Sequence, residues 1–228
     1  MSSAGRLAEP QVEAMFDRIA SVYDLMNSVM TAGMHQRWRE RAVDLAQVGP
    51  GSRALDVATG TGDLAVALRE RGAEVVGIDF AEKMLELARR KAPQIDFRSG
   101  NALALDFPDD GFDAATVGFG ARNFDDLDRG LAEMARVVKP GGRVVVLEIT
   151  TPQKPPLSFF FRAWFDQVVP LIGRLAGDPD AYEYLPNSVK RFPAPRELGG
   201  KMVAAGMTDV RWVLTAGGII AIHVGTVV

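Results

Sequence analysis

Residues 54–63, with the sequence ALDVATGTGD, combine an apolar run, a carboxylate and two glycines, Gly60 and Gly62. Glycine allows backbone angles and a close approach of a ligand that a Cβ atom would block. The segment that begins at Asp63 reads as a helix whose N-terminus lies at this turn. The pattern therefore predicts a strand, a glycine turn and a helix that together form a ligand crevice.

A second apolar run ends in the carboxylate of Asp79. Gly60, Gly62 and Ala65 have the G-x-G-x-x-A spacing of dinucleotide-binding sites, in which an acid about 20 residues further along binds a ribose. Asp79 stands at that place in the sequence. On the glycines alone, an NAD-dependent oxidoreductase is therefore an alternative.

Asp56 argues against a dinucleotide. It lies four residues before the first glycine, where its charge would repel a pyrophosphate. S-adenosylmethionine has no phosphate and carries a sulfonium and an ammonium group, so one acid near its methionine end and another at its ribose suit it. We interpret Asp56, Gly60, Gly62 and Asp79 as cofactor-binding residues for S-adenosylmethionine. An N-cap or turn acid is the alternative role for Asp56.

The composition excludes several kinds of chemistry. The chain of 228 residues has no cysteine and two histidines, which excludes disulfides, thiol nucleophiles and thiolate metal sites and leaves too few ligands for a histidine metal centre. A net charge of -3 without a basic stripe predicts no nucleic-acid partner. Residues 1–10 lack an apolar signal core, and no apolar run approaches the roughly 18 residues of a membrane span. We therefore expect a cytoplasmic protein.

Strand-like and helix-like segments alternate after residue 50. The expected strands are residues 53–58, 74–79, 95–98, 114–117 and 143–149, and the expected helices are residues 63–71, 81–91 and 125–138. This βαβ series predicts an α/β fold with a mostly parallel sheet. Residues 209–214 and 219–225 predict an antiparallel hairpin, and hence an antiparallel strand, at one sheet edge.

Two regions flank the series. We expect a single domain over residues 1–228, made of an N-terminal helical cap, a nucleoside-binding core, a substrate-side insertion and a terminal hairpin, at residues 11–47, 48–150, 151–207 and 208–228. The insertion is rich in aromatic residues at positions 159–165. A cap and an aromatic insertion over one crevice predict a bulky apolar substrate.

Two segments resemble the signatures of a known family. Residues 23–31, closed by His35 and Trp38, are similar to the N-terminal signature of the ubiquinone/menaquinone C-methyltransferases, the UbiE/MenG family. Residues 136–142, closed by residues 147–148, are similar to its second signature. Both signatures have a threonine here in place of the usual serine, and the resemblance covers nearly the whole chain.

The resemblance implies a class I methyltransferase fold, which is Rossmann-like, and transfer of a methyl group from S-adenosylmethionine to a ring carbon of a polyprenylated quinol. By matching positions, it places cofactor contacts at Thr61, Asp79, Asn101 and Ala102. A fourth family contact is a serine, which is Gly118 here, so that this side-chain contact is lost or is replaced by the backbone. The residues that it places on the substrate side are Tyr23, Asp24 and Asn27.

A ring carbon becomes nucleophilic when an adjacent hydroxyl loses its proton, and a phenol with a pKa of about 10 needs a base or a cation for this near neutrality. We expect three catalytic residues. Arg122 would stabilise the phenolate or hold a water that takes the proton, Asn123 would fix a ring oxygen, and His35 would act as the base. A packing role is the alternative for His35.

The resemblance leaves the acceptor open. We favour demethylmenaquinol because residues 181–185 look most like menaquinone-type members, and the methoxy-polyprenyl benzoquinol of the ubiquinone route is an alternative. Another small-molecule methyltransferase and a non-catalytic adenosyl-binding subunit of a quinone pathway are the others. A polyprenyl substrate also predicts peripheral contact with the inner membrane face through residues 159–165, for which core packing is the alternative. A homodimer is a further expectation.

Overall fold

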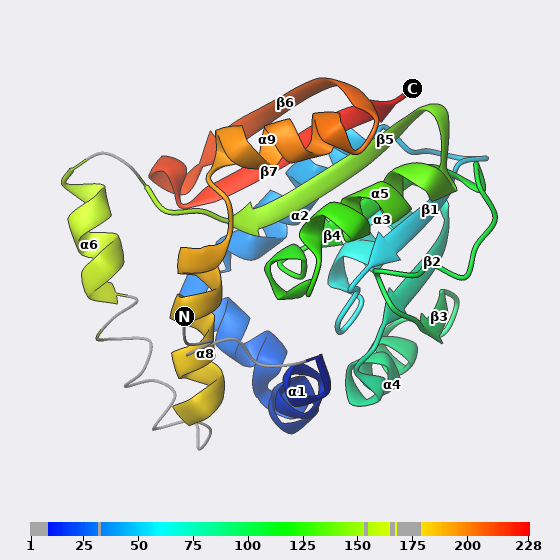
Figure 1. Ribbon diagram of the computed structural model, residues 1–228. Helices are drawn as coiled ribbons and strands as arrows, with labels where there is room; N and C mark the ends of the chain where they lie inside the picture. Colours follow the sequence, from blue (N-terminus) through cyan, green and yellow to red (C-terminus); the bar gives the residue numbers. More distant parts are fainter. Residues whose placement is uncertain (1–8, 32, 153–154, 165–166, 168–178) are drawn as a thin grey trace.

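The computed structural model describes residues 9–31, 33–152, 155–164, 167 and 179–228. These residues form one seven-stranded sheet with helices on both faces (Figure 1). The strands are β1 (Arg53–Val57), β2 (Glu74–Asp79), β3 (Asp96–Ser99), β4 (Phe112–Gly118), β5 (Val138–Ile149), β6 (Met207–Thr215) and β7 (Ile220–Val227). Their order across the sheet is β3-β2-β1-β4-β5-β7-β6.

The parallel part of the sheet agrees with the expected βαβ series. β1 pairs in parallel with β2 and β4, β2 with β3, and β4 with β5. The expected terminal hairpin is also present, because β6 and β7 pair in antiparallel register. The antiparallel strand itself is not at the edge: β7 pairs with β5 as well, and β6 occupies the edge position.

Helices cover the two faces of the sheet. Their bounds are α1 (Glu9–Thr31), α2 (Met34–Ala46), α3 (Asp63–Glu70), α4 (Glu82–Lys91), α5 (Leu127–Val137), α6 (Leu157–Ala163), α8 (Pro179–Arg191) and α9 (Pro195–Ala204), with short 3₁₀ turns at η1 (Ala121–Asn123) and η3 (Ala216–Gly218). Helices α2, α3 and α4 pack their apolar residues on one face, and α5 and α9 on the other. Strands β1 and β4 therefore lie between the two halves of the core.

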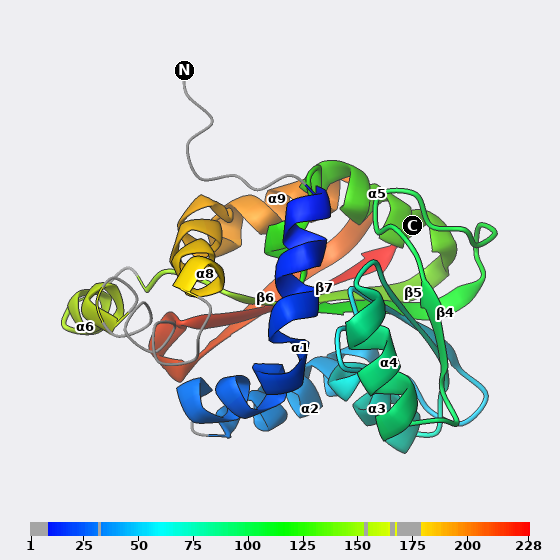
Figure 2. The same cartoon turned by 90° about the horizontal axis from the view of Figure 1, so that it is seen from below.

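The expected helical cap consists of α1 and α2. Figure 2 shows α1 crossing the molecule beside α4. Ala20 of α1 packs with Ala81 and Met84, and the ring of Phe16 meets that of Phe80 edge-on at a centroid distance of 6.5 Å. Because Phe80 directly follows β2, α1 lies near the carboxyl ends of the parallel strands. No helix in the described ranges is long and apolar enough to cross a membrane.

The second family signature lies where α5 gives way to β5. The helix ends at Val137, and Gly141 has a φ of +82°, which glycine adopts without strain. The strand begins at Val138, earlier than expected, because Val138 pairs with Phe112 across an irregular register. The remaining pairs continue β5 beside β4 to Leu147, so this turn holds the two central strands in register.

Candidate functional site

A crevice opens at the carboxyl ends of β1, β2 and β4. It is lined by residues 16, 39, 56, 58–61, 63, 64, 79, 80, 84, 118–120 and 123. An adjoining hollow, lined by residues 58, 79, 80, 100–103 and 123–125, continues it past β2. The chain turns to opposite faces of the sheet after β1 and β4, and ligands of open α/β sheets bind at such a switch point. The crevice and the hollow are therefore the candidate ligand site.

Asp56 lines the crevice and is buried. Its Oδ2 accepts a hydrogen bond from the hydroxyl of Thr59 at 2.6 Å, and its Oδ1 accepts one from Thr116 at 2.7 Å. Burial raises the pKa of Asp56 to about 6, although both hydroxyls and Arg39 act to lower it. Near neutrality the site therefore holds a buried carboxylate that a cationic group would stabilise.

Asp79 ends β2 and organises the glycine turn. Its Oδ2 accepts a hydrogen bond from the Gly60 N–H at 2.8 Å, and its Oδ1 accepts one from the Ala81 N–H at 3.0 Å. Burial raises the pKa of Asp79 above its usual value, although hydrogen bonds from the backbone N–H groups of Ala81, Gly60 and Phe80 act to lower it. An ionised carboxylate can accept about four hydrogen bonds, so Asp79 keeps acceptor capacity for a ribose hydroxyl.

The two glycines of the turn have different roles. Gly60 has a φ of +56°, and a Cβ atom built there would meet nothing within 4 Å, so the backbone faces open space on the crevice side. Gly62 is the N-cap of α3 with a φ of +82°, and its Cβ would lie 2.8 Å from Cζ of Phe97. Gly60 is therefore placed to let a ligand approach, whereas Gly62 does not line the crevice and permits close packing.

Two crevice residues have a backbone conformation that the sequence did not predict. Ala58, after β1, and Phe119, after β4, both have left-handed φ values, of +52° and +61°. Such a backbone is unfavourable for residues with a Cβ atom, and strain of this kind concentrates at functional sites. Gly120 brings the two turns together, since a Cβ atom there would lie 2.6 Å from that of Ala58. Ala58 belongs to the motif at residues 54–63, but no sequence pattern indicates the left-handed backbone of either residue.

The position that is serine in the UbiE/MenG pattern lies in the crevice. Gly118 is the last residue of β4, and a Cβ atom there would lie 3.1 Å from Cδ2 of Leu64. A serine would therefore require Leu64 to move by a few tenths of an ångström. The packing of Leu64 on β4 is compatible with glycine at this position. Because Gly118 has no side chain, its expected contact with a ligand would be made by its backbone.

Asn123 lies where the crevice and the adjoining hollow meet. Its Oδ1 accepts a hydrogen bond from the hydroxyl of Tyr184 on α8 at 3.1 Å. Tyr184 is buried, and the guanidinium carbon of Arg191 lies 5.8 Å from the centre of its ring. Because the carbonyl oxygen is bound by Tyr184, the side-chain NH₂ group of Asn123 is left to donate to a ligand.

Arg122 precedes Asn123 but does not line the crevice. Its Nη1 lies 2.7 Å from Oε1 of Glu148 and also donates to the carbonyl oxygen of Phe119, and its side chain is 7% exposed. Its backbone N–H donates to Oε2 of Glu148 at 3.1 Å. The carboxylate of Glu148 also accepts the N–H of Ile149 at 2.9 Å. This buried ion pair therefore ties η1 to the end of β5.

Four further predicted residues come from the helical cap. His35 is buried, and its Nδ1 lies 2.8 Å from the hydroxyl of Thr31, the last residue of α1. It does not line the crevice. Tyr23, Asp24 and Asn27 belong to α1, and their side chains lie outside the described part of the structure. Their expected roles in catalysis and substrate binding stay predictions.

Asn101 and Ala102 line the adjoining hollow from the segment between β3 and β4. Oδ1 of Asn101 accepts the N–H of Leu103 at 2.8 Å. Arg129 of α5 donates to the carbonyl oxygen of Leu103 at 2.6 Å. These bonds fix the turn in which both predicted cofactor contacts lie.

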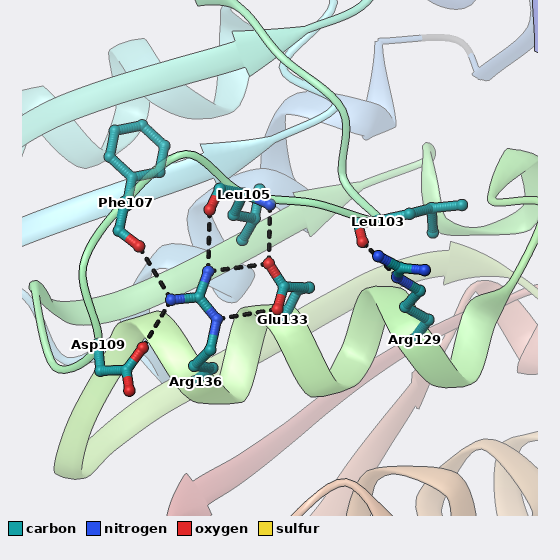
Figure 3. A network of polar contacts seen from close by, with 7 residues as sticks. All are labelled: Leu103, Leu105, Phe107, Asp109, Arg129, Glu133 and Arg136. Carbon is teal, nitrogen blue, oxygen red and sulfur yellow. Dashed lines mark hydrogen bonds and ion pairs between the residues drawn. The ribbon is translucent and has the colours of Figure 1, made fainter.

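Arg136, from the second signature, holds the rest of this segment to α5 (Figure 3). Its guanidinium donates to the carbonyl oxygens of Leu105 and Phe107, each at 2.9 Å. It also binds Asp109 at 2.7 Å and Glu133 at 2.8 Å. Hydrogen bonds from Arg136 to Glu133 and Asp109 raise its pKa above the usual value, so it is always charged. The signature thus contributes to the candidate site through the position of a loop.

Sequence comparisons identify relatives of nearly the same length. The profile of the ubiE/COQ5 methyltransferase family matches residues 5–227. A demethylmenaquinone methyltransferase of Thermus thermophilus is 51% identical over 218 residues, which cover 92% of this chain and 99% of that protein. A protein of the same name from Deinococcus radiodurans is 47% identical, with 90% and 88% covered.

Structural comparison gives the same type of fold. The crystal structure of a SAM-dependent methyltransferase from Thermotoga maritima, described as a possible histamine N-methyltransferase, superposes with a TM-score of 0.67. The alignment covers 93% of this chain and 98% of the other at 21% identity. At this identity the likeness establishes the fold and leaves the reaction open.

Proposed function

The chain belongs to the ubiE/COQ5 methyltransferase family, and on this premise we propose that it transfers a methyl group from S-adenosylmethionine to a ring carbon of demethylmenaquinol. The observation that carries the proposal is the near full-length similarity to demethylmenaquinone methyltransferases. The class I methyltransferase fold and the position of the crevice are consistent with it.

The residues of the crevice fit the cofactor. The buried carboxylate of Asp56 suits an ammonium or sulfonium group, and that of Asp79 keeps acceptor positions for ribose hydroxyls. Gly60 leaves open space where a side chain would obstruct the ligand. Thr61, Asn101, Ala102 and Gly118 line the same surface. We assign all these residues to cofactor binding, and Gly62 to the packing that supports it.

Bound S-adenosylmethionine supplies an electrophilic methyl group, so the protein must align the acceptor carbon and exclude water. Phe16, Leu64 and Phe119 give the crevice apolar walls that serve the second task. The Asn123 NH₂ group is placed to donate to a quinol oxygen. Arg122 acts through the position of Asn123, because its guanidinium is paired with Glu148.

The reaction is tested by transfer of labelled methyl from S-adenosylmethionine to chemically reduced demethylmenaquinone in detergent. The oxidised quinone and the methoxy-polyprenyl benzoquinol are assayed in parallel. We expect product from the reduced naphthoquinol alone. Product from the benzoquinol alone would establish the ubiquinone reaction instead. Cofactor binding without product from any acceptor would favour another methyl acceptor or a non-catalytic subunit.

Cofactor affinity is expected to fall as the pH falls below about 6. The pKa of Asp56 is about 6 because burial disfavours its ionised form, and a cationic ligand binds only that form. Below the pKa, the ligand must displace a proton, which costs up to about tenfold in affinity per pH unit. Titration calorimetry from pH 8 to pH 5 measures this change.

The ligand 5′-methylthioadenosine, which has neither the ammonium nor the sulfonium group, is the control. Its affinity should change much less between pH 8 and pH 5. In the Asp56→Asn variant, the affinities for the two ligands should have the same pH dependence. The contribution of Asp56 to folding stability changes with pH in the opposite direction. The folded pKa exceeds the unfolded value of about 3.9, so the contribution of Asp56 to stability rises as the pH falls from about 7 to 4. Equal pH profiles of affinity for S-adenosylmethionine and 5′-methylthioadenosine would contradict the binding of a cationic group by Asp56.

We also propose that the protein contacts the inner membrane face through α6. Phe159 and Phe160 are 71% and 63% exposed, and Trp164, which caps the helix, is 41% exposed. Phe161 is buried against Val189, so only part of the aromatic run is core. Aromatic side chains favour the membrane interface, and a polyprenyl substrate resides in the bilayer. Phe165 lies outside the described residues.

Replacing both Phe159 and Phe160 with serine is expected to reduce binding to anionic lipid vesicles at least about fivefold in a sedimentation assay, since each removes an apolar ring from the contact. Val203→Ser on α9 is the control, because Val203 is also exposed, at 57%. Equal binding by both variants and the parent protein would refute membrane contact through α6. The expected homodimer, and the expected single domain made of four regions, stay proposals.

A further inference from the structure

One side of the crevice carries a positive charge that the assigned cofactor contacts do not use. Among the described residues that line the crevice, the ionisable groups are Arg39, Asp56, Asp63 and Asp79. Arg39 is thus the one cation among three carboxylates. It comes from α2, in the cap, and it is buried, with an exposed fraction of 9%.

Arg39 is held in place before any ligand binds. Its Nη1 lies 3.1 Å from Oδ2 of Asp63, the first residue of α3. Its guanidinium carbon lies 5.9 Å from the centre of the Phe119 ring, which in turn packs edge-on against Trp38. An arginine fixed by an ion pair and an aromatic ring loses little freedom when it binds a further group.

The ion pair with Asp63 does not use all that Arg39 offers. Within the described part of the chain, its buried Nη1 lies 3.1 Å from Oδ2 of Asp63 but forms no hydrogen bond. Buried polar groups are nearly always hydrogen-bonded in native proteins, so this guanidinium keeps N–H groups that can donate to a ligand oxygen in the crevice. Asp63 has a second cation, since Lys91 Nζ lies 2.6 Å from its other oxygen.

The electrostatics of Asp63 agree with this arrangement. Burial acts to raise the pKa of Asp63, but Arg39 and Lys91 outweigh it and hold the pKa below its usual value. Asp63 therefore stays ionised between two cations. Arg39 can share its charge with a second anion at a crevice that is otherwise acidic.

We propose that Arg39 binds the α-carboxylate of the methionine part of the cofactor. The inference rests on the proposed function, because it assigns one end of the same ligand. The ligand has an ammonium, a sulfonium and a single carboxylate, and arginine recognises carboxylates through two parallel N–H donors. Asp56 accounts for a cationic group and Asp79 for the ribose. Arg39 completes the charge match at the first turn of α3, whose N-cap Gly62 provides no side-chain cap.

The experiment compares two ligands and two proteins. The ligands are S-adenosylhomocysteine and its decarboxylated analogue, which differ only in the carboxylate, and the proteins are the parent chain and Arg39→Met. Titration calorimetry should show S-adenosylhomocysteine binding weakened at least about tenfold by the substitution. The affinity for the analogue should change less than about twofold, because it has no group for Arg39 to bind.

Two further variants make the test decisive. Arg39→Lys should recover part of the lost affinity for S-adenosylhomocysteine only, since it keeps the charge without the paired donors. Arg71→Met, which breaks an exposed ion pair with Asp44, should leave both affinities unchanged. If Arg39→Met weakens both ligands by the same factor, Arg39 is structural and the inference is wrong. If the parent protein binds neither ligand, the proposed function itself fails.

Discussion

Asp79→Asn is expected to weaken cofactor binding by at least about tenfold, although the two side chains have the same shape. Both oxygens of Asp79 accept backbone N–H groups, from Gly60 and Ala81. An asparagine offers one acceptor, so its NH₂ group must face one of these donors. The glycine turn then shifts, and the ribose also loses its charged acceptor. Hydrogen bonds to charged groups contribute about 1.5–3 kcal/mol, which is about 10- to 150-fold in affinity.

Cofactor affinity is measured by calorimetry and stability by thermal unfolding. Glu74→Gln is the matched control, because Glu74 begins the same strand, is exposed and forms an ion pair with Arg53 at its side. It should leave the cofactor affinity unchanged. An Asp79→Asn variant with the affinity of the parent protein would remove Asp79 from the cofactor site. A lower unfolding temperature with unchanged cofactor affinity would show that Asp79 supports the glycine turn alone.

The sequence was sufficient for the part of the site that comes from consecutive residues. Asp56 and Gly60 are four residues apart, and Asp79 ends the next strand, so strand length and turn chemistry placed all three at one sheet edge. Arg39 and Phe16 reach the same crevice from the helical cap. Their arrival depends on how the cap packs on the sheet, and no local pattern encodes that packing.

The sequence was less informative about residues that act through a distant partner. Arg122 was expected at the quinol ring, and the structure places its guanidinium on Glu148, 26 residues away in the sequence. Glu148 belongs to the second signature segment, but a signature does not say which of its residues meet. The sheet order was similarly incomplete: a hairpin could be predicted, whereas insertion of β7 between β5 and β6 follows from long-range pairing.

Arg122→Met is expected to destabilise the protein by about 3–5 kcal/mol, because it leaves Glu148 as a buried and unpaired charge. The variant also removes the side-chain link between η1 and β5 and leaves only the backbone N–H of residue 122 on Glu148, so turnover should fall with stability. Chemical unfolding and the methyl-transfer assay measure the two effects. Lys139→Met, which breaks the exposed ion pair with Asp113, should change stability by less than about 1 kcal/mol.

The double variant Arg122→Met with Glu148→Gln separates a positioning role from a role at the ring. Glutamine removes the unpaired charge and keeps an oxygen that can accept a backbone N–H from η1 or from Ile149. If Arg122 acts by positioning Asn123, the double variant recovers most of the lost stability and most of the turnover, and this is the result we expect. Recovered stability with turnover still absent would instead place Arg122 in the reaction, as the sequence first suggested. Cofactor affinity close to that of the parent protein in the double variant is the check that the crevice itself is intact.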